Sequence, residues 1–478
     1  MAEFTVAIEL GSSKITGIAG RKNKDGSITV LAIAQEDSAS CIRKGVVYNI
    51  DKTVHALSNI IKKLETSLKT RIAHVYVGVG GQSIQSVRNT NVKELPSEGE
   101  VTPDMINELM DANRSMQYPD KLILDAITQE YKVDNLFTTD PVGVQCKRLE
   151  GNFLNILWRK SFYRSLKKCF DQANISVLDM YLSPLAMADS VLTEAEKRGG
   201  CVLVDLGAET TTVCVFHKSI LRHLAVIPLG GNNITKDIAS LQMEDKDAER
   251  MKIKYASAYT DSNDIEKDRT YPIDDERTVD MPKFVDIVEA RTREIIENAW
   301  NQVPDEYTDK LLGGIILTGG GCNMRNIERA FRTYTSIDKI RVAKFVTETI
   351  KSGSPIVNAK DGRLCTVLGI LAKGNQNCAG GDLMGDLFDH PDPKPATTTQ
   401  HPEQSSGSGR VIDPAEAQRQ KEEEARKKQE EDEKRRREQE AEEQRLREEK
   451  HKNSWLHKAF SNLRAFGKKM VDEEEEEK

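Results

Sequence analysis

Short runs of apolar residues that end in glycine recur through the first 378 residues of this chain. The first run, Phe4–Gly20, reaches a Gly/Ser turn and continues as a second alternating run, which is typical of a β-hairpin. The run Cys201–Phe216 has the same form. When the two are aligned, Ala7–Ser13 matches Leu203–Glu209 as strand, acid, apolar residue, glycine and then small or polar residues. The repeat predicts two related lobes, because its period is too long for a solenoid.

The segments around the two hairpins alternate between helical and extended patterns. Helices are predicted at Lys52–Leu68, from the cap residue Thr102 onward, at Tyr163–Ile175, from about Asn233, at Phe284–Trp300 and at Leu364–Gly374. Strands are predicted at Ala73–Gly81, at Leu122–Val133 and at the start of Val177–Leu192, which continues as a helix. The segment Gly314–Phe331 has the pattern of a buried strand, three glycines and a helix, whereas Glu244–Asp280 is mainly polar. The mixture indicates an α/β protein.

The composition changes after about residue 375. Residues Ala379–Pro414 are rich in Gly, Pro, Ser, Thr and Asp, which predicts a flexible linker. Residues Ala415–Lys452 are nearly all Glu, Lys, Arg and Gln, with pairs such as Glu422–Arg426 that stabilise a solvated helix. A heptad stripe is missing, so a coiled coil is not expected, but a helix and a disordered tether both remain open.

Charge and cysteine content exclude several classes of protein. The net charge is -7 and no basic domain stands out, so no nucleic-acid partner is expected. The eight cysteines are scattered without a CxxC pair or a secretory signal, which favours a reducing cytoplasm. No apolar run has the roughly 18 residues that a membrane-spanning helix needs.

The paired hairpins carry the clearest candidate chemistry. A tight turn of glycine and small hydroxyl residues exposes backbone N–H groups that can surround a phosphate. Glu9 or Asp205, at the strand end, could bind the water molecules of Mg²⁺, and Lys14 could meet a phosphate as a point charge. A third glycine-rich turn, Gly319–Gly321, precedes a helix N-terminus that suits an anion or a nucleotide. Gly78–Gly81 is interpreted only as a turn at a strand end.

Other catalytic signatures are missing from the sequence. It contains no Walker A motif, no metal-ligand cluster and no nucleophile elbow of the G-x-S-x-G type. The segment Ala248–Ser257 would by itself also fit an exposed charged helix.

Together, these motifs resemble the actin/Hsp70/sugar-kinase family of ATPases. The resemblance identifies Glu9–Lys14 and Asp205–Thr211 as phosphate loops and Thr318–Met324 as an adenosine loop, with Ala248–Ser257 supplying an acid and a lysine near the adenosine. It implies that two lobes clamp ATP and Mg²⁺. The implied nucleotide-binding residues are Gly11, Ser12, Ser13, Lys14, Gly207, Ala208, Thr210, Gly230, Gly231, Asn232, Glu249, Lys252, Gly319, Gly320, Gly321, Asn323 and Met324, with Glu9 and Asp205 as water-mediated metal ligands.

Within that group, residues 1–378 resemble the FtsA family of bacterial cell-division proteins, above all in Leu192–Ala239 and Ser86–Gln172. The resemblance implies an actin-like fold of duplicated RNase H-like lobes with an inserted 1C subdomain. The implied parts are lobe I (residues 1–82 and 166–198, closed by helix 362–378), the 1C subdomain (83–165), lobe II (199–240 and 304–361) and the 2B subdomain (241–303).

Two residues depart from the usual pattern of this fold. Glu9 stands where many relatives have aspartate, which remains compatible with Mg²⁺. Ala208 and Glu209 replace a glycine-rich continuation, and the Glu209 carboxylate would repel phosphates unless it pointed away. We therefore expect nucleotide binding with at most slow hydrolysis, and no catalytic residue can be named.

The last hydrophobic cluster of the chain lies at residues 453–471, before an acidic tail at 472–478. On a helical wheel its apolar residues share one arc and its cations the other, which predicts a helix lying in the plane of an anionic membrane. Docking in a partner's groove or on the chain's own globular part remains open. The predicted membrane contacts are Trp455, Leu456, Lys458, Phe460, Leu463, Arg464, Phe466, Lys468 and Lys469. The acidic tail should weaken a single helix, and a polymer would compensate by avidity.

The family resemblance implies a polymerising, ATP-binding adaptor on the cytoplasmic face of the cell membrane at the division site. Its implied partners are the tubulin-like protein FtsZ, contacted through about Leu241–Val303, copies of itself and later division proteins. Two alternatives share the fold: a small-molecule kinase, which would need a catalytic carboxylate in a substrate pocket, and an Hsp70-like chaperone ATPase. The linker and charged segment argue against the chaperone, which would need a β-rich peptide-binding domain there.

Overall fold

The computed structural model describes residues 3–379 and Gly409. The predicted linker (379–414), charged segment (415–452), amphipathic helix (453–471) and acidic tail (472–478) lie outside the described residues, apart from Ala379 and Gly409. Those predictions therefore stay predictions. Within the described part, no helix combines the length and hydrophobicity needed to cross a membrane.

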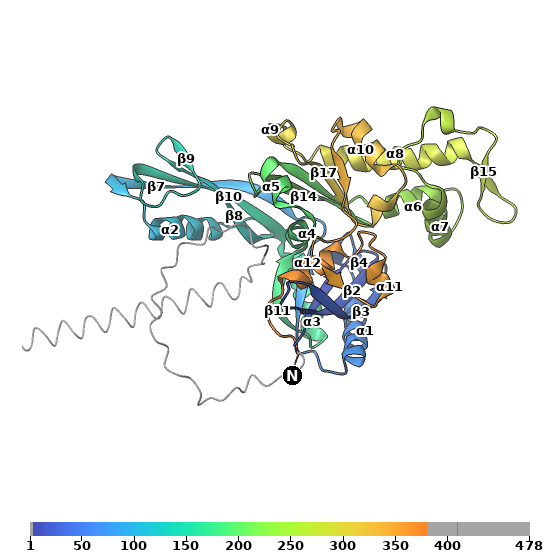
Figure 1. The fold of residues 1–478 in the computed structure, drawn as a ribbon, viewed down its shortest axis with the longest axis horizontal. Coiled ribbons are helices and arrows are strands. Elements are labelled where there is room, and N and C mark those ends of the chain that lie inside the picture. Colours follow the sequence, from blue (N-terminus) through green and yellow to red (C-terminus); the bar gives the residue numbers. More distant parts are fainter. Residues whose placement is uncertain (1–2, 380–408, 410–478) are drawn as a thin grey trace, which may run out of the picture. The chain divides into compact units, whose positions relative to one another are not determined.

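Lobe I is built on a six-stranded sheet with the order β11-β6-β1-β2-β3-β19 (Figure 1). Its strands are β1 (Thr5–Leu10), β2 (Lys14–Lys22), β3 (Ile28–Asp37), β6 (His74–Val79), β11 (Ser176–Leu182) and β19 (Ile350–Lys351). Helix α1 (Ile50–Leu68) packs on β2 and β3, while α12 (Cys365–Lys373), paired with α4 (Ser183–Val191), packs on β1, β2 and β6. Residues 350–351, which the prediction gave to lobe II, thus extend the sheet of lobe I.

Lobe II repeats this arrangement. Its strands β12 (Cys201–Leu206), β13 (Thr211–His217), β14 (Ile220–Ile227), β17 (Gly314–Thr318) and β18 (Ile340–Val342) follow the order β18-β17-β12-β13-β14. This is the lobe I order β11-β6-β1-β2-β3, strand for strand, with β1 and β12 each paired antiparallel to the next strand and parallel to a later one. The prediction of two related lobes is confirmed.

The helices of lobe II and the 2B subdomain pack on one face of this sheet or beside it (Figure 1). The helices are α6 (Gly231–Ala239), α7 (Asp245–Tyr255), α8 (Met281–Trp300), α9 (Asp305–Thr308) and α10 (Ile327–Thr335), and the 3-10 turns are η1 (Ser262–Asp264) and η2 (Gly320–Asn323). Two short strands, β15 (Thr270–Pro272) and β16 (Thr278–Asp280), form a small hairpin. The polar stretch of the sequence therefore contains a helix, α7, and a hairpin. The remaining helix of ordinary length is α3 (Lys160–Gln172), and the short elements elsewhere are β4 (Ile42–Arg43), β5 (Val46–Val47), α5 (Glu194–Gly199) and α11 (Pro355–Asn358).

The inserted 1C subdomain continues the sheet of lobe II. Its strands are β7 (Gln85–Glu100), β8 (Lys121–Val133), β9 (Leu136–Thr138) and β10 (Gln145–Arg159), and α2 (Pro103–Arg114) covers one side of them (Figure 1). The pairing of Ala225 with Gln85 makes one nine-stranded sheet. At this junction, Leu224 N–H donates to Ser86 Oγ (2.8 Å) and the Arg222 guanidinium donates to Gln129 Oε1 (3.2 Å). The long strands β7 and β10 were not predicted from the sequence.

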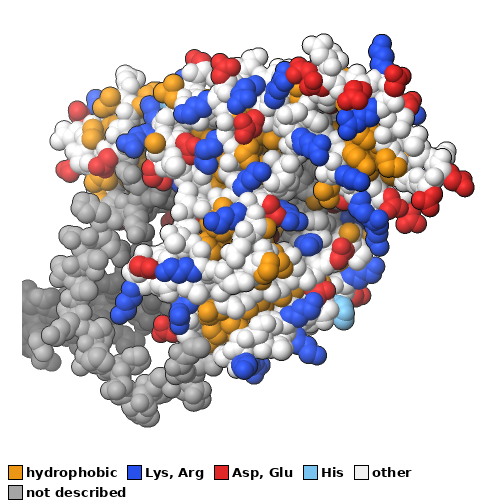
Figure 2. Space-filling view, turned by 45° about the vertical axis from the view of Figure 1, so that its right-hand side comes forward, with side chains coloured by type: hydrophobic (Ala, Val, Ile, Leu, Met, Phe, Trp, Pro, Cys, Tyr) orange, Lys and Arg blue, Asp and Glu red, His pale blue; other side chains and the backbone are white. Residues whose placement is uncertain are grey.

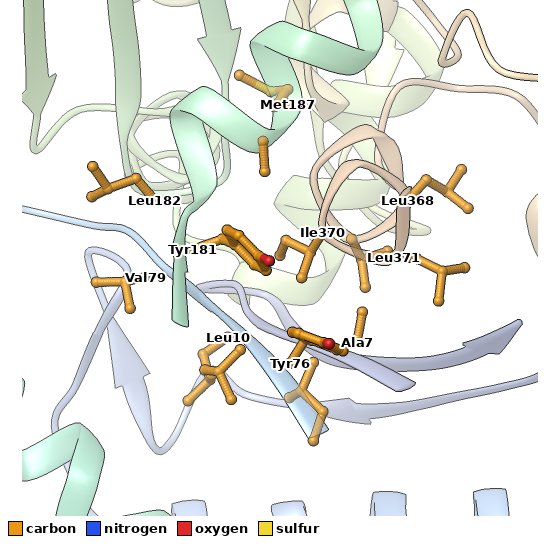
Figure 3. Close-up of a cluster of buried hydrophobic side chains, with 14 of the residues drawn as sticks. Ala7, Leu10, Tyr76, Val79, Tyr181, Leu182, Met187, Leu368, Ile370 and Leu371 are labelled. Atoms are coloured by element: carbon orange, nitrogen blue, oxygen red, sulfur yellow. The ribbon is translucent and has the colours of Figure 1, made fainter. Parts of the chain in front are cut away.

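One buried hydrophobic cluster includes residues from both lobes. In lobe I, Leu368, Ile370 and Leu371 of α12 lie with Met187 of α4 over β1 and β6 (Figure 3). Tyr76 and Tyr181 stack beneath them, with ring centroids 5.8 Å apart. The same buried cluster extends to residues on the lobe II strands β12, β13, β14 and β17, so α4 and α12 connect the lobes through shared apolar contacts.

Candidate nucleotide-binding site

A cavity of about 920 Å³ lies between the two lobes at the ends of the paired hairpins. Every nucleotide-binding and metal-ligating residue predicted from the sequence lines it. The lining from lobe I includes Glu9, Gly11, Ser12, Ser13 and Lys14, and the lining from lobe II and 2B includes Asp205, Gly207, Ala208, Thr210, Gly230, Gly231, Asn232, Glu249, Lys252, Gly319, Gly320, Gly321, Asn323 and Met324. A cavity of this size can enclose most of a nucleotide-sized ligand.

The two hairpin loops have the same backbone geometry. Gly11 N–H donates to Lys14 O at 3.1 Å, and Gly207 N–H donates to Thr210 O at 2.9 Å. The strands on either side pair in the same register, with Glu9 opposite Thr16 and Asp205 opposite Thr212. Each loop therefore presents a tight turn toward the cavity two positions after a carboxylate, with backbone N–H groups that could surround a phosphate.

Glu9 and Asp205 face the cavity from opposite lobes, and both have raised pKa values. Burial raises the pKa of Glu9 to about 8, with a further contribution from the nearby Asp205 charge, against hydrogen bonds from Thr366 and the Val367 N–H at the start of α12. Burial also raises the pKa of Asp205 to about 6. Two desolvated carboxylates close together favour protonation unless a cation is shared between them.

This pair fits Mg²⁺ chemically, because hard oxygen ligands and room for retained water are what the ion requires. Glu9 and Asp205 would bind it through water, and the ion would neutralise charge on the phosphates. Within the described residues, no group of three or more His, Cys, Asp or Glu side chains offers a complete protein ligand set.

Glu209 does not line the cavity, so its carboxylate does not face the phosphate position. Instead it accepts a hydrogen bond of 2.6 Å from the backbone N–H of Lys44, which belongs to lobe I. The next amide, Gly45 N–H, donates to Ser12 Oγ at 2.8 Å. We call Lys44–Gly45 the bridging turn, because consecutive amides of this turn bind both phosphate loops. The repulsion anticipated from the sequence is avoided by this orientation.

The 2B side of the cavity is fixed by Lys252 of α7. Its Nζ donates to Gly231 O (3.0 Å) and Thr235 Oγ1 (2.8 Å) in the first turns of α6, and it pairs with Glu249 at 2.6 Å. The Lys252 side chain is 11% exposed, so α7 is not simply an exposed charged helix. The contacts place the positive end of the α6 dipole at the cavity, which favours an anion there.

The triple-glycine turn must lie close to Asp205. Gly319 has φ of 81°, and a Cβ there would meet the Asp205 carboxylate and come within 2.7 Å of Leu206 O. Only glycine fits both the backbone conformation and this approach. Asn323 fixes the far side of the turn, since its Nδ2 donates to Asp361 O at 2.6 Å.

Two further segments line the cavity without having been predicted. Gly78 lies near the end of β6 in lobe I, and Gly80 and Gly81 follow this strand at the position where Gly319–Gly321 follow β17 in lobe II. The internal repeat could have identified these glycines, but the sequence pattern was interpreted only as a turn at a strand end. The second segment, Asp361–Leu364, carries an Asp-Gly turn before α12. Its Arg363 pairs with Asp361 and gave no signal in the sequence.

Comparison with known proteins agrees with this geometry. A family model described as cell division protein FtsA matches residues 202–369, and one described as the SHS2 domain inserted in FtsA matches residues 81–157. The cell division protein FtsA of Porphyromonas gingivalis is 30% identical over 385 residues, which cover 79% of this chain and 80% of that protein. The chain belongs to the FtsA family.

Two other FtsA proteins support the assignment. That of Pseudomonas aeruginosa is 30% identical over 82% of this chain and 95% of its own length, and that of Neisseria meningitidis is 32% identical over 68% and 80%. A solved structure of the PilM-PilN type IV pilus biogenesis complex has a TM-score of 0.55 at 15% identity, covering 77% of this chain and 98% of that chain, which shows similarity of fold alone. The predicted actin-like, two-lobed fold with an inserted subdomain is confirmed, and the SHS2 match overlaps the predicted 1C range of 83–165.

Proposed function

We propose that this FtsA-family chain binds ATP with Mg²⁺, polymerises, and tethers a ring of FtsZ to the cytoplasmic face of the cell membrane at the division site, where it recruits later division proteins. The cavity carries this proposal. Residues from five separate segments, which the family resemblance assigned to one nucleotide site, line one space between the lobes.

In this proposal each wall of the cavity has a distinct task. The amides of the two hairpin loops and the N-terminus of α6 bind the phosphates, and Lys14 adds a positive charge. Glu9 and Asp205 orient the hydrated Mg²⁺. Apolar side chains such as Met324 and Ile253, which both line the cavity, are suited to contact a purine.

Hydrolysis is proposed to be slow. The two carboxylates at the phosphate loops are assigned to Mg²⁺, and Glu209 is bound to Lys44 N–H. No side chain is therefore assigned as the base that would activate a water molecule. The protein then acts mainly as an adaptor, whose nucleotide state controls how the lobes are held together.

The membrane contact is proposed from the sequence of residues 453–471. An adaptor of this kind needs a surface for the membrane and another for FtsZ, and we assign the latter to the 2B region, about Leu241–Val303. One face of the molecule shows mixed Lys/Arg and Asp/Glu side chains with small hydrophobic groups between them (Figure 2).

Liposome sedimentation tests the membrane role. Trp455→Asp with Phe460→Asp should release the full chain from anionic liposomes, because both changes place charge on the apolar arc of the predicted helix. The matched control is Ser454→Asp with Ser461→Asp, which adds the same charge on the polar arc and should retain most binding. Equal sedimentation of both variants and the unchanged chain would contradict the proposal.

Co-sedimentation with FtsZ tests the adaptor role. FtsZ should reach the liposome pellet only when the unchanged chain is present, and should remain in the supernatant with the Trp455→Asp, Phe460→Asp variant. If FtsZ stays in the supernatant although the chain itself pellets, the FtsZ assignment is wrong while the membrane assignment stands.

A further inference from the structure

Gly409 lies buried against the globular part of the chain, 30 positions beyond Ala379. Its carbonyl oxygen accepts a hydrogen bond of 2.5 Å from the backbone N–H of Leu182. Leu182 is the last residue of β11, which is the edge strand of the lobe I sheet. The end of this edge strand therefore has a main-chain partner from a distant part of the same chain.

The contact requires glycine. Gly409 has φ of 68°, a conformation that other residues rarely adopt, and a Cβ on it would come within 2.9 Å of Leu185 Cβ. Leu185 lies in α4, which is packed against α12 and cannot move away easily. A bulkier residue at 409 would thus meet both backbone strain and a clash.

The other side of the contact belongs to the inserted subdomain. Asp125 of β8 is 6% exposed, and its Oδ1 accepts a hydrogen bond of 2.8 Å from the Ala126 N–H. Burial raises the pKa of Asp125 to about 6, and a hydrogen bond from the Gly409 backbone N–H opposes that rise, as do the charges of Arg114 and Lys373. A buried carboxylate is costly unless donors face it, so the N–H of Gly409 is a favourable partner.

We propose that Asp125, Leu182 and Leu185 form a peptide-binding seat between the inserted subdomain and lobe I, and that its occupant is the chain's own segment at Gly409. The seat binds a glycine-containing main chain, with the glycine in the left-handed conformation, through one N–H and one C=O. The C=O of Gly409 accepts from the Leu182 N–H at 2.5 Å, and its N–H faces the Asp125 carboxylate.

Occupancy of the seat has two consequences. It connects β8 to β11 and α4, and so restrains the inserted subdomain against lobe I. It also anchors the chain at residue 409 rather than 379. Because an extended chain spans about 3.3–3.6 Å per residue, release would add roughly 100 Å to the maximum reach of everything beyond it. Only this second consequence rests on the proposed membrane tether.

Hydrogen exchange at the Leu182 amide in the full chain tests the seat. Peptic fragments that cover Leu182 should be protected in the unchanged protein. Gly409→Val should raise exchange of that amide by about tenfold or more, because its acceptor is lost. Gly407→Val, two positions earlier, is the matched control and should leave exchange at Leu182 unchanged.

Three results would overturn the proposal. Equal exchange in all three proteins would show that Gly409 does not occupy the seat. An equal loss of Leu182 protection in Gly407→Val and Gly409→Val would show that the effect is not specific to Gly409. Protection that grows with protein concentration would show that a second copy fills the seat. A thermal unfolding midpoint unchanged by Gly409→Val would confirm that the variant is folded, and a collapsed midpoint would be resolved with Gly409→Ala. That milder change should raise Leu182 exchange by a smaller factor.

Discussion

The two hairpin loops at the cavity have the same backbone geometry and different chemistry. Each follows a carboxylate, closes with a hydrogen bond between its first and fourth residues, and leads into an antiparallel strand in the same register. The lobe I loop carries a cation, Lys14, toward the cavity. The lobe II loop carries an anion, Glu209, which binds the N–H of Lys44 in the other lobe. The two loops thus share one geometry, while their charged residues face different partners.

The carboxylates that precede the loops should give the largest effect. Glu9→Gln with Asp205→Asn should remove the Mg²⁺ dependence of ATP affinity, since both proposed outer-shell ligands lose their charge. We expect affinity in the presence of Mg²⁺ to fall by roughly 100-fold, and each single change by roughly tenfold. Isothermal titration with and without Mg²⁺ measures this. A double variant that still gains affinity from Mg²⁺ would refute the metal assignment.

The charged residues of the two loops, Lys14 and Glu209, should each weaken nucleotide retention when neutralised, by different routes. Lys14→Ala should weaken ATP binding by about tenfold through loss of a charge near the phosphates. Glu209→Gln should speed nucleotide release by roughly threefold to tenfold, because a charge-assisted hydrogen bond between the lobes becomes a neutral one. Stopped-flow release of a fluorescent nucleotide measures both. If Glu209→Gln instead tightened binding, the carboxylate would be facing the phosphates.

The pH dependence of stability should identify Glu9. Its pKa is about 8 in the nucleotide-free fold and near 4.5 when exposed, so the folded protein binds more protons between these values. Its contribution therefore makes the fold less stable as pH rises from about 4.5 to 8. The thermal unfolding midpoint should therefore fall less between pH 5 and pH 8 in Glu9→Gln than in the unchanged chain. An unchanged difference would mean that Glu9 titrates normally.

Ser12 should give the smallest effect. Ser12→Ala removes the acceptor for Gly45 N–H and leaves the Glu209 contact on the neighbouring amide, so release should quicken by about threefold or less. Combining it with Glu209→Gln should have more than the summed effect on the bridging turn, because both changes act on consecutive amides. Strict additivity in the release rate would show that the two loops are not coupled through that turn.

The sequence predicted the parts of the molecule that rest on local patterns. The Gly-rich turns, the acids before them and the hairpins were visible because each is specified by adjacent residues, and their duplication made the lobes recognisable. Their convergence on one cavity followed from the family resemblance. The long strands β7 and β10 were missed, because their many polar positions give little of the alternation that marks a half-buried strand.

Contacts between residues far apart in the chain could not be predicted from the sequence either. The bond between Glu209 and Lys44 joins positions 165 residues apart, and the Gly409 contact depends on a sheet edge formed by Leu182. Neither contact can be predicted from the residues adjacent to it in the sequence. The glycines of Gly78–Gly81 are an intermediate case. Their position at the cavity could be predicted only by aligning the second lobe with the first.

ATP titration of two Gly320 variants tests the central claim most directly, that the two lobes bind one nucleotide between the hairpin loops and the glycine turn. A Cβ at Gly320 would meet only the Arg363 side chain, at 3.4 Å, so both variants should fold. Gly320→Ala should bind ATP with Mg²⁺ within about threefold of the unchanged chain. Gly320→Asp should lose roughly 100-fold or more, because it adds a negative charge beside the nucleotide. Equal affinity of the two variants would contradict the account.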